Sequence, residues 1–189
     1  MKVLTFGEIM LRLRAPWHER LFQSGSLEAT FGGGEANVAV SLANYGVDVE
    51  YFTILPDNTI ADACVRELRK FGVDTRKIQR GEGRMGLYFL EAGSNQIPSR
   101  VVYDRAYSAI SLADPASVDW KTVLAGRDWF HISGITPAIS RTAMELSLAA
   151  VHTAKEMGLT VSCDFNYRNS LWKYEGADVK KTMSQLLTC

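Results

Sequence analysis

The chain has 189 residues, 47% of them hydrophobic and 22% charged, and its formal net charge is zero. This composition suits one globular α/β domain and excludes a disordered or coiled-coil chain. The balanced charge gives no reason to expect nucleic acid or an anionic membrane as a partner. The 3 cysteines and 3 histidines show no metal-ligand spacing, so we expect no metal site and a reduced, cytoplasmic protein.

The N-terminal segment alternates and includes Glu8 and Arg12, which predicts a strand and not a signal peptide or a membrane span. The pattern then continues as strand, helix, strand, helix, which favours a mostly parallel sheet with helices on both faces. The predicted elements are a strand over 3–14, loop or short strands over 17–31, a helix over 34–45, a strand over 49–55, a helix over 60–71 and a strand near 75–79.

The order of strand and helix changes between residues 85 and 105, where two runs of alternating apolar and polar residues flank a polar link at 94–98. These runs predict an antiparallel hairpin, which we interpret as a lid over a ligand or as a dimer contact. Alternation then resumes. The later predicted elements are a strand over 128–133, a helix over 140–157 with Ser140 as its N-cap, a strand over 160–164 and a helix over 177–187.

A helix at this point of an α/β pattern should lead to a further strand, and the chain ends at Cys189. We therefore expect the N-terminal portion of a longer α/β enzyme, with a fold truncated at its C-terminus. Within it, the predicted lid segments lie near 12–30 and 85–105.

The segment "SCDFNYRN" ends a buried strand in polar groups. Side chains two apart share a face of a strand, so Asp164, Asn166 and Arg168 are predicted to line one side. Ligands of open α/β sheets bind beyond the carboxyl ends of the strands, and an arginine and an amide there suit an anion. The alternative is a polar turn in which Asp164 caps the backbone and Arg168 is solvated.

The segment "FGGGEANVAV" places three glycines before a helix but meets neither the dinucleotide fingerprint nor the P-loop, since a third fingerprint glycine and a Lys-Ser/Thr pair are both missing. It predicts a helix N-terminus that a polar ligand such as a sugar can approach closely, with Asn37 one turn in. A tight turn that only permits helix packing is the alternative.

The hairpin carries Tyr88, Tyr103 and Arg105, which could close together over an acidic sugar. An exposed aromatic face or a dimer interface explains the same pattern. His131 lies between aromatic residues in mid-strand and is predicted to be a core histidine. The backbone that follows this strand, at Gly134 and Ile135, could contact a ligand.

Five motifs, in this order and spacing, make the chain resemble the ribokinase-like (PfkB) carbohydrate kinases over essentially its whole length. They are "GEIMLRL", "GGGEANVAVSLANYG", "DRAYSAIS", "HISGITPAIS" and "CDFNYRNSLW". Within that family the chain is most similar to the branch that phosphorylates 2-keto-3-deoxygluconate. The resemblance implies a central sheet with helices on both faces and a small β lid that also mediates a homodimer.

The resemblance also implies roles for eight residues around a sugar-acid site. Arg168 is the implied catalytic group, because it would stabilise charge on the substrate and on the transferred phosphoryl group, and Asn166 lies with it towards the phosphoryl group of ATP. The implied substrate-binding residues are Gly34, Asn37, Tyr88, Tyr103, Arg105, Ile135 and Arg168.

The family's catalytic aspartate, in a Gly-Ala-Gly-Asp turn, does not occur in this sequence, and the family's nucleotide site lies in the C-terminal half. We therefore predict that the full-length parent phosphorylates a sugar acid with ATP and Mg²⁺, and that this chain alone is inactive. The alternatives are a fructokinase-like kinase of a neutral sugar, and a non-catalytic sugar-binding or dimerisation module.

Overall fold

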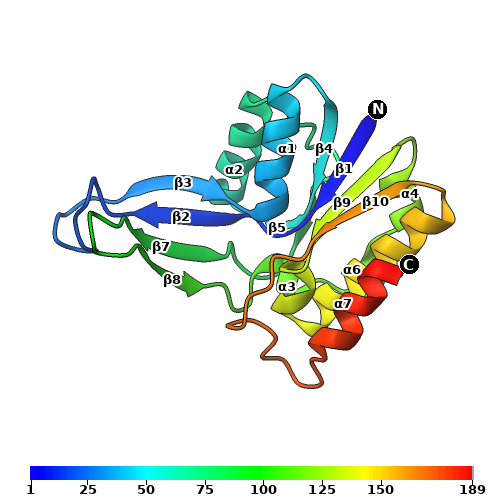
Figure 1. Ribbon diagram of the computed structural model, residues 1–189. Helices are drawn as coiled ribbons and strands as arrows, with labels where there is room; N and C mark the ends of the chain where they lie inside the picture. Colours follow the sequence, from blue (N-terminus) through cyan, green and yellow to red (C-terminus); the bar gives the residue numbers. More distant parts are fainter. Residues whose placement is uncertain (189) are drawn as a thin grey trace.

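The computed structural model describes residues 1–188, which form a central sheet covered by helices and a second four-stranded sheet that projects from it (Figure 1). We call this projecting sheet the small sheet. The central sheet comprises β1 (Lys2–Phe6), β4 (Asp48–Phe52), β9 (Trp129–Ser133) and β10 (Thr160–Asp164) in the order β10-β9-β1-β4. Every neighbouring pair in it is parallel. The predicted parallel sheet is therefore confirmed.

Helices cover both faces of the central sheet, because both faces of its strands are apolar. On one side Val3 and Tyr51 pack with α1 (Gly34–Asn44) and α2 (Thr59–Lys70). On the other side Phe6 and Phe130 pack with the second group of helices (Figure 1). That group comprises α4 (Trp120–Leu124), α6 (Arg141–Glu156) and α7 (Val179–Thr188).

The predicted start and ends of the long helices are confirmed. The hydroxyl of Ser140 accepts a hydrogen bond from the Ala143 amide at 3.1 Å, which caps α6. Gly46, Gly72 and Gly158 follow α1, α2 and α6 with φ of 76°, 83° and 79°, the left-handed conformation in which glycine is strain-free.

The small sheet comprises β2 (Met10–Arg14), β3 (Glu28–Gly32), β7 (Leu87–Glu91) and β8 (Arg100–Asp104) in the order β3-β2-β7-β8. β7 and β8 pair antiparallel, so the predicted hairpin is confirmed, and β2 pairs parallel with β7. The small sheet extends away from the helices at the left of Figure 1. The two segments predicted as a lid lie in it; their closure over a ligand stays a prediction.

The prediction of one strand over 3–14 is wrong, because β1 and β2 belong to different sheets and are joined by residues 7–9. The chain turns there against α1. A Cβ atom at Gly7 would lie 2.2 Å from the Glu35 carboxyl carbon, so only glycine fits. The alternating pattern continues through the turn and therefore conceals it.

The predicted strand near 75–79 is displaced, since the paired strand is β6 (Gln79–Gly81), which lies beside β5 (Ile54–Pro56). Four short elements were not predicted, because one or two turns show no periodicity. They are α3 (Ala109–Leu112), a 3₁₀ helix (Pro115–Ser117), α4 and α5 (Thr136–Ile139). Within residues 1–188, no helix combines the length and the apolar character needed to span a bilayer.

Candidate functional site

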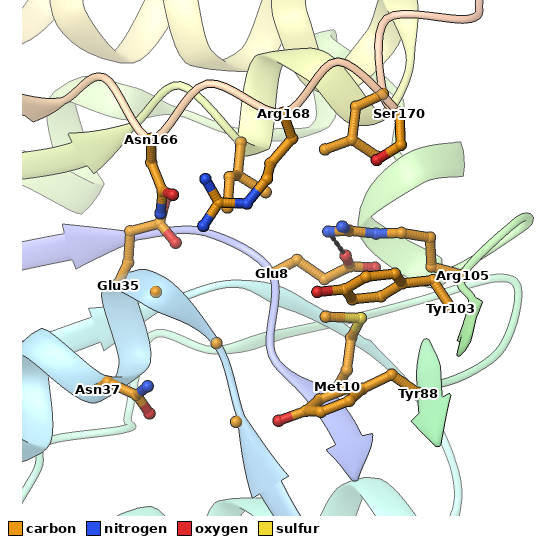
Figure 2. Close-up of a pocket in the computed structure, with 15 residues that line it drawn as sticks. Glu8, Met10, Glu35, Asn37, Tyr88, Tyr103, Arg105, Asn166, Arg168 and Ser170 are labelled. Atoms are coloured by element: carbon orange, nitrogen blue, oxygen red, sulfur yellow. Dashed lines mark hydrogen bonds and ion pairs between the residues drawn. The ribbon is translucent and has the colours of Figure 1, made fainter. Parts of the chain in front are cut away.

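A cavity of ≈ 240 Å³ lies where the small sheet meets the carboxyl ends of the central strands (Figure 2). All eight residues to which the family resemblance gave a role line it, although they come from five separate segments of the chain. They are Gly34, Asn37, Tyr88, Tyr103, Arg105, Ile135, Asn166 and Arg168. Tyr103, Arg105, Asn166 and Arg168 thus share one hollow, as the sequence predicted.

The N-terminus of α1 forms one wall of the cavity. Its N-cap, Gly33, has no side chain to satisfy the first amides of the helix. Gly33 also packs against the β1–β2 link, since a Cβ atom there would lie 2.2 Å from the Glu8 carbonyl oxygen. At Gly34 a Cβ atom would meet Asn166 Nδ2 at an ordinary 3.8 Å. The two glycines therefore differ: Gly33 is required by packing, whereas Gly34 leaves space in the cavity.

The segment after β10 forms the facing wall, and here the structure corrects one prediction. Asn166 and Arg168 line the cavity, but Asp164 does not. Asp164 instead accepts a hydrogen bond from the Asn166 amide at 3.1 Å, and Asn166 adopts φ of 35°. The strand ends at Asp164, so the two-residue alternation no longer governs which way the following side chains point. Asp164 therefore caps the backbone of a turn, which was the alternative interpretation of this segment.

The small sheet supplies the third wall through the register of its strands. Thr30, Arg12, Tyr88 and Tyr103 are successive partners across β3, β2, β7 and β8, and partners on adjacent strands share a face. The centres of the Tyr88 and Tyr103 rings are consequently 5.8 Å apart. The Arg105 guanidinium lies 5.8 Å from the centre of the Tyr103 ring, within the range of a cation–π contact.

Two buried carboxylates line the cavity and were not predicted as site residues. Glu35 Oε1 accepts hydrogen bonds from the Ser133 amide (3.0 Å), the Ser133 hydroxyl (2.7 Å) and the Thr136 hydroxyl (3.0 Å). Burial raises the pKa of Glu35, and these hydrogen bonds oppose the rise. Glu35 thereby joins the start of α1 to the corner between β9 and α5, where Ile135 lies.

Glu8 is the second of these carboxylates and lies in the link between β1 and β2. Its Oε2 atom accepts a hydrogen bond from Arg105 Nη2, and this ion pair is drawn as a dashed line in Figure 2. Both acids occur in the motifs "GEIM" and "GGGEAN". An acid inside an otherwise apolar or small-residue segment was the available signal for them.

Five further residues line the cavity without having been predicted: Met10, Gly32, Gly33, Ser170 and Leu171. Ser170 and Leu171 follow Arg168 in an irregular segment, where no pattern shows which side chains face inward. Met10 begins β2 and Gly32 ends β3. A Cβ atom at Gly32 would lie 2.8 Å from the Tyr88 hydroxyl, so this glycine leaves room for the tyrosine.

His131 lies away from the cavity. Its Nδ1 atom lies 2.8 Å from the Ser162 hydroxyl, so it has a hydrogen-bond partner as predicted, but it is half-buried in β9 and is not part of the core. Burial lowers its pKa. Residues 1–188 contain no trio of His, Cys, Asp or Glu positioned to hold a metal ion. The two carboxylates of the cavity are engaged by Arg105 and by Ser133 and Thr136, so they are not arranged as ligands of Mg²⁺.

The comparison with known proteins agrees with this fold and places the chain in a family. The family model of the pfkB family carbohydrate kinases matches residues 1–189. The chain is 38% identical to the 2-dehydro-3-deoxygalactonokinase of Haloferax volcanii over 90% of this chain and 54% of that protein.

Two solved structures illustrate the likeness. The 2-dehydro-3-deoxygluconokinase of Thermotoga maritima is 54% identical, with a TM-score of 0.88 over 91% of this chain and 53% of that one. The fructokinase of Xylella fastidiosa with bound ATP is 22% identical and shares the fold, with a TM-score of 0.83 over 98% of this chain and 55% of that one. The chain thus spans about half the length of these relatives. The chain belongs to the pfkB family of carbohydrate kinases, and its fold is ribokinase-like.

Proposed function

We propose that the whole protein transfers the γ-phosphate of ATP to the primary hydroxyl of 2-keto-3-deoxygluconate, giving the 6-phosphate, and that this chain carries the sugar-acid site. The observation that supports the proposal is the convergence of Arg105 and Arg168 on one small cavity. A guanidinium binds a carboxylate or phosphate through paired hydrogen bonds. The volume of ≈ 240 Å³ is below the range typical of drug-sized ligands and suits a small metabolite.

The residues around the cavity divide into two groups in this proposal. Gly34, Asn37, Tyr88, Tyr103 and Ile135 contact the sugar, and Arg105 lies near its carboxylate. Asn166 and Arg168 lie between the sugar and the phosphoryl group, where Arg168 stabilises developing negative charge. Arg168 suits this task because its guanidinium donates a hydrogen bond to the neighbouring Tyr167 carbonyl (3.1 Å) and pairs with no carboxylate among residues 1–188.

The base, the nucleotide site and any Mg²⁺ ligands lie outside this chain in the proposal. Phosphoryl transfer needs a group that accepts the proton of the attacking hydroxyl. The carboxylates of the cavity are already engaged, Glu35 by Ser133 and Thr136, and Glu8 by Arg105. Use of ATP is supported by the family relative that was solved with ATP. We place the reaction in the cytoplasm.

We also propose that the protein forms a homodimer through the small sheet. Ala29, Leu13, Phe89 and Val102 are successive partners across its four strands, on the face opposite Tyr88 and Tyr103. They make an apolar row that ends at the edge strand β8, where Val102 is 55% exposed. An exposed apolar face beside an unpaired edge is a surface that a second copy can cover.

The substrate is tested with the full-length protein in a coupled assay of ADP release. The expected result is a kcat/KM for 2-keto-3-deoxygluconate or its 4-epimer at least 100-fold above that for fructose. Equal or faster turnover of fructose would favour the fructokinase alternative. The isolated 189-residue chain is expected to bind the sugar acid but to release no ADP, and turnover by it at an ordinary kinase rate would contradict the assignment of the base to the remainder of the protein.

A further inference from the structure

The ion pair between Glu8 and Arg105 joins two of the four points at which the chain enters or leaves the small sheet. Glu8 lies in the link that leads from β1 into β2, and Arg105 directly follows β8. Figure 2 shows Arg105 reaching the Glu8 carboxylate beside the Tyr103 ring. The pair is thus positioned to couple the base of the small sheet to the cavity.

The neighbouring glycines leave space for Glu8. A Cβ atom at Gly86 would lie 2.9 Å from Glu8 Oε1, and one at Gly33 would lie 2.2 Å from the Glu8 carbonyl oxygen. Glu8 is only 4% exposed, and such a buried carboxylate needs a cation beside it. Arg105 is the cation that pairs with it, and among the described residues Glu8 Oε1 and Arg105 Nε have no hydrogen-bond partner.

The two arginines that line the cavity therefore differ in whether a carboxylate pairs with them. Glu8 compensates the positive charge of Arg105, whereas no carboxylate among residues 1–188 pairs with Arg168. The remaining acid, Glu35, is held by Ser133 and Thr136. An anion that binds Arg105 must share the guanidinium with Glu8, and a negative charge beside a cation weakens the attraction of that cation for a second anion.

We infer that Glu8 is the positioning residue of the sugar-acid site: it aligns Arg105 towards the cavity and sets how strongly this arginine attracts the carboxylate of the substrate. The inference rests on the proposed function, since it assigns Arg105 to the sugar-acid carboxylate. Two variants separate the two effects. Glu8→Gln keeps the length and an acceptor oxygen but removes the charge. Glu8→Asp keeps the charge but is one methylene too short to hold Arg105.

The test follows the Nε–H signal of Arg105 by ¹⁵N NMR, assigned by its loss in Arg105→Lys. Wild type and both variants are titrated with 2-keto-3-deoxygluconate and with pyruvate, a 2-keto acid without hydroxyls. NMR detects binding with millimolar dissociation constants, so weak binding of either anion can be measured. We expect the dissociation constant of both ligands to fall about tenfold in Glu8→Gln and to rise about tenfold in Glu8→Asp. Glu28→Gln, the same change on an exposed face of β3, should leave both constants unaltered.

The dissociation constant should change in opposite directions in the two variants, and this distinguishes positioning from a merely structural role. A general loosening of the fold would weaken binding in both variants. Equal weakening, no change in either variant, or the absence of any ligand-induced shift would overturn the inference. If Arg105→Ala abolishes sugar-acid binding while both Glu8 variants match wild type, only the inference fails. The wild type could instead bind pyruvate and not the sugar acid, while the dissociation constant for pyruvate still falls in Glu8→Gln and rises in Glu8→Asp. In that case the proposed substrate fails and the assignment of Glu8 stands.

Discussion

Ser133 donates two hydrogen bonds to Glu35, one from its amide at 3.0 Å and one from its hydroxyl at 2.7 Å. This pair holds the N-terminus of α1 against the carboxyl end of β9. The two walls that contribute Gly34 and Ile135 to the cavity are therefore joined by one buried carboxylate. The geometry of the cavity depends on a contact between residues that are distant in sequence.

Removing the Glu35 carboxylate should destabilise the protein. Glu35→Ala leaves three buried donors without an acceptor, so the free energy of unfolding should fall by about 2–4 kcal/mol. Urea unfolding followed by circular dichroism measures this change. Glu82→Ala, in the exposed bend that follows β6, serves as the control and should change the value by less than about 0.5 kcal/mol. An equal effect of both variants would contradict the role given to Glu35.

Burial raises the pKa of Glu35 in the folded state, which gives a pH dependence of definite sign. The folded protein holds this proton more tightly than the unfolded chain does, so the protonated group adds stability that is complete below the unfolded pKa of about 4.3. That stability is lost as the pH rises through the folded pKa. Glu35→Gln cannot titrate, so its stability relative to wild type should increase from pH 4 upward. Parallel stability curves for the two proteins would exclude the raised pKa.

The glycines before α1 should respond differently to the same substitution. Gly34→Ala adds a methyl group that meets its neighbours at an ordinary distance, so it should leave the melting temperature nearly unchanged but fill space in the cavity. We expect at least tenfold weaker sugar-acid binding by calorimetry. Gly33→Ala forces a 2.2 Å contact with the Glu8 carbonyl and should lower the melting temperature by several degrees. Normal binding by Gly34→Ala would remove Gly34 from the site.

Arg168→Ala should reduce kcat of the full-length protein by about 100-fold or more, because a charge that stabilises the transition state is worth roughly 3–4 kcal/mol. KM for ATP should change less than about threefold. ADP release at saturating substrates measures both. The matched control is Arg76→Ala, an exposed arginine that pairs with Asp74 away from the cavity. A fall in kcat below tenfold would place Arg168 outside the reaction.

The dimer proposed for the small sheet predicts a face-specific effect. Val102→Lys places a charge in the apolar row of Ala29, Leu13 and Phe89, and should shift the protein towards monomer in light scattering coupled to gel filtration. Val101→Lys, one residue earlier and on the opposite face of β8, should leave the assembly unchanged. Dissociation by both variants, or by neither, would argue against this interface.

Much of the molecule was predictable from local patterns. The order of strands and helices indicated the parallel sheet, and alternating apolar and polar residues indicated the hairpin. The glycines that follow α1, α2 and α6 indicated where these helices end. Polar residues at the end of an apolar segment indicated Asn166 and Arg168, and the shared face of the hairpin indicated the hairpin residues that line the cavity. These inferences succeeded because side-chain periodicity and the left-handed conformation of glycine depend on neighbours a few residues apart.

The amino-acid sequence by itself determined most of the longer elements, the candidate residues and the family to which the motifs belong. Only the tertiary structure decided that the segment 3–14 divides between two sheets, that Asp164 turns away from the cavity, and that Glu8 and Glu35 hold its walls together. The Asp164 turn is local, but the other two outcomes depend on contacts across the fold. A contact of that kind leaves no period in the sequence, because its partners lie up to about a hundred positions apart.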